Sequence, residues 1–170
     1  LVAIIGSAYA LIAASLVARF AAGTKAVLQN TEDVTLLKPL HGAEAALDSN
    51  LESFCTQDYA ADIQMVCGVQ DPHDPAILFV QNLRANFPDS DIRLAIGSKP
   101  SSGNPKIANI INMMPETSHN VLILSDSDMN VATDYAANIV ATLQQPEVGL
   151  VTCLYRGRAV GGVWSRLAAA

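Results

Sequence analysis

Residues 121–128 read VLILSDSD, an apolar run that passes directly into two aspartates separated by one residue. The run predicts a buried strand at 121–124, and extended backbone beyond it would point Asp126 and Asp128 the same way. Two close carboxylates repel each other unless a cation or proton lies between them, and Mg²⁺ and Mn²⁺ prefer oxygen ligands. We therefore predict that Asp126 and Asp128 bind Mg²⁺ or Mn²⁺ shared with a diphosphate. A solvated turn or a helix cap is the alternative interpretation of such a pair.

The residues around this strand alternate between short apolar runs and amphipathic stretches with helical spacing. Five strands separated by helices imply a mostly parallel sheet with helices on both sides, an α/β fold. The expected strands are 34–37, 63–69, 92–96, 121–124 and 148–154. The expected helices cover 47–54, 75–87 (after Asp74 as N-cap), 107–114 and 135–143 (capped by Thr133).

In open parallel sheets the ligand lies outside the carboxyl ends of the strands. This rule selects Lys38 after the first expected strand, Asp71 after the second and the Asp126–Asp128 pair after the fourth. Asp71 could accept hydrogen bonds from a base or a ribose. Lys106 starts an expected helix, where a lysine and a helix N-terminus together favour a phosphate, although a plain surface lysine is the simpler interpretation.

The first 18 residues carry no charge, and as a helix they would span roughly 27 Å, close to the hydrocarbon core of a bilayer. We expect a transmembrane helix at 1–20 and a linker at 21–33, with the body at 34–170. Arg19 and Lys25 place the body on the cytoplasmic side by the positive-inside rule. A secretory signal peptide and a buried core helix are the alternatives.

The composition excludes several classes of protein. Of the 170 residues, 51% are hydrophobic and 15% charged, which excludes bulk disorder. A net charge of −6 argues against a nucleic-acid binder, because those proteins display basic faces. Three unclustered cysteines do not form a disulfide framework and fit a reducing compartment.

Four ordered motifs resemble one known family. LLKPLHG at 36–42, VQDPHDPA at 69–76, GNPKI at 103–107 and SDSD at 125–128 are similar to ceramide glucosyltransferases, the GT-A (Rossmann-like) enzymes of glycosyltransferase family 21. LVTCLYRG at 150–157 is similar to the bacterial hopanoid-biosynthesis branch of that family. The resemblance covers residues 33 to about 167, and a membrane helix before the domain is also typical.

The resemblance implies a membrane-anchored, inverting glycosyltransferase that moves a sugar from a UDP-sugar to the hydroxyl of a membrane lipid, ceramide or a hopanoid. It implies that Lys38, Asp71, Lys106 and Asp126 bind the nucleotide sugar, and that Asp126 and Asp128 bind the metal. The family's third aspartate, taken as the catalytic base, and its Q-x-x-R-W motif do not occur in this sequence. We therefore expect an N-terminal fragment with the donor-binding half of a bacterial inner-membrane enzyme and without a catalytic residue.

Two other classes of function stay open at this point. Haloacid-dehalogenase-like phosphatases also place D-x-D after an apolar strand, and Asp126 would then be the nucleophile. Those enzymes usually carry Thr or Val where this chain has Asn130. A membrane-tethered, non-catalytic nucleotide-binding module is the other alternative.

Overall fold

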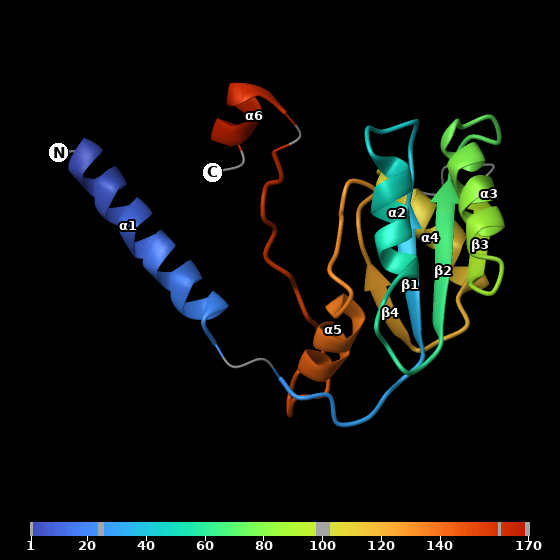
Figure 1. The fold of residues 1–170 in the computed structure, drawn as a ribbon, viewed down its shortest axis with the longest axis horizontal. Coiled ribbons are helices and arrows are strands. Elements are labelled where there is room, and N and C mark those ends of the chain that lie inside the picture. Colours follow the sequence, from blue (N-terminus) through green and yellow to red (C-terminus); the bar gives the residue numbers. More distant parts are fainter. Residues whose placement is uncertain (1, 24–25, 98–102, 160, 169–170) are drawn as a thin grey trace.

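The computed structural model describes residues 2–23, 26–97, 103–159 and 161–168. Lys25, most of the expected 97–105 loop and the last two alanines lie outside these ranges. Figure 1 shows a helical arm, a compact sheet with helices around it, and a C-terminal extension. The elements are α1 (Val2–Ala21), β1 (Val34–Pro39), α2 (Leu47–Cys55), β2 (Ile63–Val69), α3 (Ala76–Asn86), β3 (Asp91–Ile96), α4 (Pro105–Met113), the 3₁₀ turn η1 (Met114–Glu116), β4 (Val121–Leu124), α5 (Tyr135–Leu143) and α6 (Gly162–Ala168).

The four strands form one parallel sheet in the order β3-β2-β1-β4. Val34 of the central strand β1 pairs with Ile63 of β2 on one side and with Val121 of β4 on the other. All four carboxyl ends therefore lie at one edge of the sheet, as an α/β fold requires. The expected α/β architecture is confirmed.

The two faces of the sheet are covered to different extents. Helices cover one face, whereas on the other α4 lies over β1 and β2 and leaves Leu122 and Leu124 of β4 exposed. On one face, Leu36 and Cys67 pack with Phe54 of α2, Val80 of α3 and Val140 of α5. Strand residues that point to the other face form a smaller cluster with Met113 of α4. They are Leu37, Val66 and Ala95. Helices α2, α3 and α5 thus share one side of the sheet, and α4 lies on the other (Figure 1).

Helix α4 lies very close to β2 at Gly68. A Cβ atom at this position would be 2.4 Å from the Met113 Sδ and 2.6 Å from the Asn109 Oδ1. The Asn109 amide donates to the Gly68 carbonyl at 2.8 Å. The absence of a side chain at Gly68 therefore lets α4, and with it Lys106, sit directly on the sheet.

The fifth expected strand, 148–154, is wrong. These residues have no strand structure, and the stretch 149–156 runs along a groove beside β4 and α5. Leu150 and Leu154 are 80% and 64% exposed. Apolar spacing favours an extended chain, but a strand also requires hydrogen bonds to a neighbouring strand, and β4 pairs with β1 alone among the described strands.

Helix α4 starts at Pro105 rather than at 107, and the expected cap of α5 is wrong. Thr133 does not cap α5, since Asp134 precedes its first residue, and the Gln57 side chain accepts from the Ala136 N–H at 3.0 Å. The Asp74 side chain does serve the start of α3, because it accepts from the Ala76 N–H at 2.8 Å. It also accepts from the Gly42 N–H at 2.9 Å and so joins the loop after β1 to α3.

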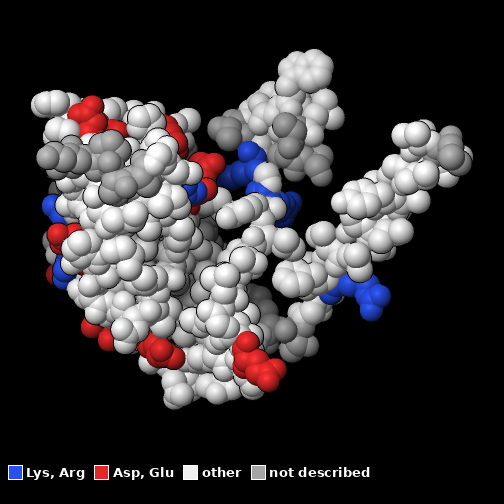
Figure 2. Space-filling model, turned by 180° about the vertical axis from the view of Figure 1, so that it is seen from behind, with Lys and Arg blue, Asp and Glu red and all other residues white. Residues whose placement is uncertain are grey.

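Helix α1 is a single apolar helix with no buried residue. Its length and composition suffice to cross a membrane, although signal sequences near an N-terminus have the same properties. Within this chain, α1 does not pack inside the molecule, so it is not a core helix of the described part. Figure 2 shows the arm almost free of charged side chains, in contrast to the acidic body.

Candidate functional site

A cleft of about 400 Å³ opens at the carboxyl edge of the sheet. The ends of β1, β2 and β4 and the first turns of α4 form its walls. The lining residues are Pro39, Leu40, His41, Glu44, Gln70, Pro105, Lys106, Asn109, Asp126, Ser127 and Asp128. The cleft therefore lies at the place that the topology of a parallel sheet reserves for ligands.

Both aspartates of the SDSD motif line this cleft. The burial pattern of β4 continues past the strand, so that Ser125 and Ser127 are buried and Asp126 and Asp128 are exposed. The segment does not stay extended, because Ser127 and Asp128 lie in a turn in which the Met129 N–H donates to the Asp126 carbonyl at 3.4 Å. Both carboxylates nevertheless line the same cleft.

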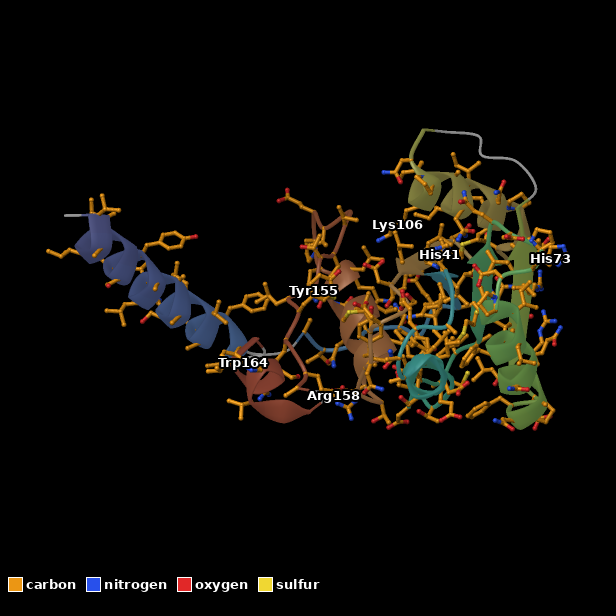
Figure 3. All side chains as sticks on the ribbon, turned by 90° about the horizontal axis from the view of Figure 1, so that it is seen from above. His41, His73, Lys106, Tyr155, Arg158 and Trp164 are labelled. Atoms are coloured by element: carbon orange, nitrogen blue, oxygen red, sulfur yellow. The ribbon has the colours of Figure 1, made fainter. Side chains whose placement is uncertain are left out.

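Lys106 lies across the cleft on α4. Its ammonium pairs with the Asp126 carboxylate, and the two side chains are 50% and 49% exposed. The start of α4 is fixed by Asn104, whose side chain accepts from the Lys106 N–H at 3.0 Å and from the Ile107 N–H at 3.3 Å. Figure 3 shows Lys106 and His41 together at this edge of the sheet, with His73 further away.

Lys38 lies beneath the cleft and is not part of its lining. Its side chain is fully buried, with the Nζ 3.8 Å from the centroid of the Phe54 ring. The ammonium donates to the Asp126 carbonyl at 2.5 Å and to the Ser125 Oγ at 3.3 Å. Burial lowers the pKa of Lys38 to about 8, against the opposing effect of nearby acidic groups, Asp126 and Asp128 among them.

Asp71 is exposed in the turn after β2 and is not part of the cleft lining. Its carboxylate accepts from the His73 N–H at 2.8 Å and closes that turn. The adjacent Gln70 does line the cleft and donates to the Pro105 carbonyl at 2.9 Å. Of the predicted site residues, the cleft therefore collects Lys106, Asp126 and Asp128, and its lining leaves out Lys38 and Asp71.

Sequence reasoning missed Glu44, Gln70 and Asn109. The Glu44 carboxylate accepts from the Ser127 Oγ at 2.6 Å, which ties the loop after β1 to the SDSD segment. Gln70 directly precedes Asp71 at a strand end, so the strand-end rule could have found it. Glu44 and Asn109 carried no comparable signal, because a loop and a helix bring them to the cleft.

The donor set of the cleft suits a hard cation in combination with a phosphate. Carboxylate oxygens are what Mg²⁺ and Mn²⁺ prefer, and Mg²⁺ commonly takes one or two protein carboxylates together with substrate phosphates. Within the described ranges, no group of three or more His, Cys, Asp or Glu side chains could hold a metal on its own. Two aspartates beside a lysine thus fit a cation whose other ligands are phosphate oxygens and water.

Comparison with known proteins gives the family. The family model described as Glycosyl transferase family 21 matches residues 1–170. The chain belongs to glycosyl transferase family 21. This membership confirms the resemblance to family 21 and argues against a haloacid-dehalogenase-like phosphatase.

Among relatives, the chain is 28% identical over 123 residues to a ceramide glucosyltransferase of Candida albicans. The matched region covers 66% of this chain and 23% of the relative. It is 28% identical over 120 residues to ceramide glucosyltransferase 3 of Caenorhabditis elegans, and this match covers 70% of this chain and 26% of the relative. The chain thus spans about a quarter of the length of the curated relatives that it matches.

Among solved structures, the mannosyltransferase PcManGT from Pyrobaculum calidifontis, in complex with GDP-Man and Mn²⁺, is similar with a TM-score of 0.64 and 19% identity. The match covers 86% of this chain and 43% of that one. At this identity the likeness concerns the fold, and it agrees with the expected GT-A architecture.

Proposed function

We propose that this chain is the donor-binding part of a membrane-anchored glycosyltransferase that uses a UDP-sugar and a divalent cation. The observation that carries the proposal is the convergence of Asp126, Asp128 and Lys106 in one cleft at the carboxyl edge of the sheet. Two carboxylates and an ammonium complement a metal diphosphate, in which negative phosphate oxygens and a cation alternate. Membership of family 21 supplies the class of reaction.

Asp126 and Asp128 would hold Mg²⁺ or Mn²⁺ in this cleft. The cation offsets the negative charge that develops on the departing diphosphate. Lys106 would move its ammonium from the Asp126 carboxylate to a phosphate oxygen when the nucleotide sugar binds. The N-terminus of α4 would support that phosphate, since its N–H groups face an anion favourably.

Asp71 would contact the nucleotide from the turn after β2. Its partner in this structure is the N–H of His73 in its own turn. The Oδ1 of Asp71 thus holds the turn, and the Oδ2 would accept a hydrogen bond from a ribose hydroxyl or a base N–H.

The reaction in the whole enzyme would be a single in-line displacement at the anomeric carbon, which inverts its configuration. A base must take the proton of the acceptor hydroxyl. We assign this role to no residue of this chain. The acceptor that best fits the relatives, named ceramide glucosyltransferases, is a lipid alcohol such as ceramide or, from the motif at 150–157, a hopanoid.

Helix α1 would anchor the enzyme in the membrane that contains its acceptor. Its 20 residues rise roughly 30 Å, which matches the hydrocarbon core. Arg19 in its last turn supports a cytoplasmic position for the body, where sugar nucleotides are found, and a bacterial inner membrane would suit this arrangement.

Calorimetric titration with UDP tests the proposal. We expect binding in the presence of Mn²⁺, little binding in the presence of EDTA, and a loss of at least about tenfold in Asp126→Ala, because a metal ligand and a phosphate partner disappear together. Asp62→Ala is the matched control, since Asp62 is an acid at the opposite edge of the sheet, directly before β2. Equal UDP binding by the wild type with Mn²⁺, the wild type with EDTA and Asp126→Ala would refute the metal-diphosphate site.

A further inference from the structure

The fully buried Lys38 is the feature that the proposed metal site leaves without a role. A lysine side chain is almost never fully buried unless it is paired. Lys38 belongs to the central strand β1, and no part of it is exposed. It therefore cannot contact a bound nucleotide directly in this conformation, although the sequence predicts that it does.

The ammonium of Lys38 donates its hydrogen bonds to the segment that carries the two aspartates. The Nζ donates to the Asp126 carbonyl at 2.5 Å and to the Ser125 Oγ at 3.3 Å. Charge-assisted hydrogen bonds of this kind are roughly twice as strong as neutral ones. They fix the backbone at the residue where β4 ends and the acidic pair begins.

The other side of the ammonium is closed by an aromatic ring. The Nζ lies 3.8 Å from the centroid of Phe54, which is buried in α2. A desolvated cation over a ring face is attracted by the ring quadrupole. The ring and the two oxygen acceptors together leave the ammonium little freedom to move.

Charge adds a second reason for this placement. Glu44, Asp126 and Asp128 are each close enough to favour the protonated form of Lys38. All three carboxylates line the cleft directly above. A buried positive charge below them reduces their mutual repulsion without occupying their carboxylate oxygens, since the ammonium donates to the Asp126 carbonyl and the Ser125 Oγ.

We propose that Lys38 is a positioning residue that holds the Ser125–Asp128 segment in its metal-binding shape from beneath, through the Asp126 carbonyl and the Ser125 hydroxyl. This inference rests on the proposed metal-diphosphate site. Residues that orient metal ligands in this way typically change metal affinity by about tenfold to a hundredfold when they are replaced.

Two variants of the full chain separate this role from general stability. Lys38→Met keeps the length of the side chain and removes the charge, and replacement of a buried charge by an apolar group of similar size is often neutral for stability. Thr35→Val is the matched control, because Thr35 is another fully buried polar residue of β1. Its hydroxyl donates to Gln64 at 2.9 Å, away from the cleft.

Hydrogen–deuterium exchange of the metal-free chain gives the first measurement. We expect Lys38→Met to raise exchange at the amides of 125–128 by about tenfold or more and to leave β2 unchanged, since the lost bonds are local. Thr35→Val should leave 125–128 as in the wild type. Unchanged exchange at 125–128 in a folded Lys38→Met chain would overturn the proposal.

Binding of Mn²⁺ with UDP gives the second measurement. We expect Lys38→Met to weaken it by about tenfold or more and Lys38→Arg to recover part of the loss. If Lys38→Met does not fold, Phe54→Leu serves instead, since it removes the ring below the ammonium, and we expect a smaller change in the same direction. Wild-type failure to bind Mn²⁺ with UDP would count against the proposed function, whereas equal binding by wild type and a folded variant would count against Lys38 alone.

Discussion

Gly68 shows how one residue sets the geometry of the cleft. Its Cα lies against Asn109 and Met113 of α4, and the Asn109 amide donates to its carbonyl. The same helix carries Lys106 toward Asp126. The position of the ammonium thus depends on the absence of a side chain on the neighbouring strand.

Replacing Gly68 by Ala should lower the free energy of unfolding by about 1–3 kcal/mol, because the new methyl group would overlap Met113 and Asn109. Urea unfolding followed by circular dichroism measures this change. Gly103→Ala is the control, since nothing lies within 4 Å of a Cβ at that position. Equal stability of the two variants would show that α4 does not rest on Gly68.

At the scale of single residues, the sequence predicts the acidic pair better than the rest of the cleft. Asp126 and Asp128 come shortly after an apolar strand, and the position of a strand end is a local property of the sequence. The role of Lys38 could not be read in the same way, because a residue at the end of a strand can point into a cleft or into the core. The elements that pack on each face of the sheet decide which of the two directions the Lys38 side chain takes.

At the scale of elements, the cleft depends on how α4, which packs on β1 and β2, is placed opposite the segment that follows β4. The ammonium of Lys106 on α4 occupies one carboxylate of the pair that follows β4. A cation in the cleft would have to compete with that ammonium, whereas a diphosphate would give it a new partner. Lys106 should therefore act in opposite directions on the metal alone and on the metal with nucleotide.

Lys106→Met should strengthen binding of Mn²⁺ alone by a few fold, about 1 kcal/mol or less, because a half-exposed ion pair competes only weakly. It should weaken binding of UDP with Mn²⁺. Both affinities can be measured by electron paramagnetic resonance of free Mn²⁺. Arg93→Met is the control, since Arg93 forms a similarly exposed ion pair with Asp91 at the other edge of the sheet. A parallel change in both affinities would contradict this account.

The sheet illustrates what element prediction can and cannot reach. The strands predicted at 34–37, 63–69, 92–96 and 121–124 are present at 34–39, 63–69, 91–96 and 121–124, because short apolar or alternating runs indicate strands. The run at 148–154 looks the same in sequence, but it has no strand partner among the described residues. Pairing is a property of two segments, so one segment alone does not predict it.

At the scale of the whole molecule, the chain separates into an apolar arm, in which Arg19 is the charged residue, and an acidic body (Figure 2). None of the residues of α1 is buried against the body. The exposed apolar face of such a helix needs a partner of its own, and a bilayer is the partner we propose. The body would then keep its cleft on the cytoplasmic side of that bilayer.

Flotation of the full chain with lipid vesicles tests the membrane anchor. We expect the wild type to float and to resist extraction by high salt, because apolar burial is not screened by ions. Replacing Leu11 and Ile12, at the middle of α1, by Lys should abolish flotation, since each charge at the centre of a membrane helix costs about 2.5–3.5 kcal/mol on insertion scales. Leu122→Lys on the exposed side of β4 serves as the control. Flotation that persists in the α1 variant would point to a different membrane contact.

The most direct measurement is anomalous diffraction from a crystal of this chain soaked with Mn²⁺ and UDP. The account predicts one manganese peak in the cleft, at about 2.0–2.3 Å from carboxylate oxygens of Asp126 and Asp128, with the diphosphate completing its coordination. Manganese bound elsewhere, or a diphosphate held in the cleft by Lys106 without any metal, would contradict it.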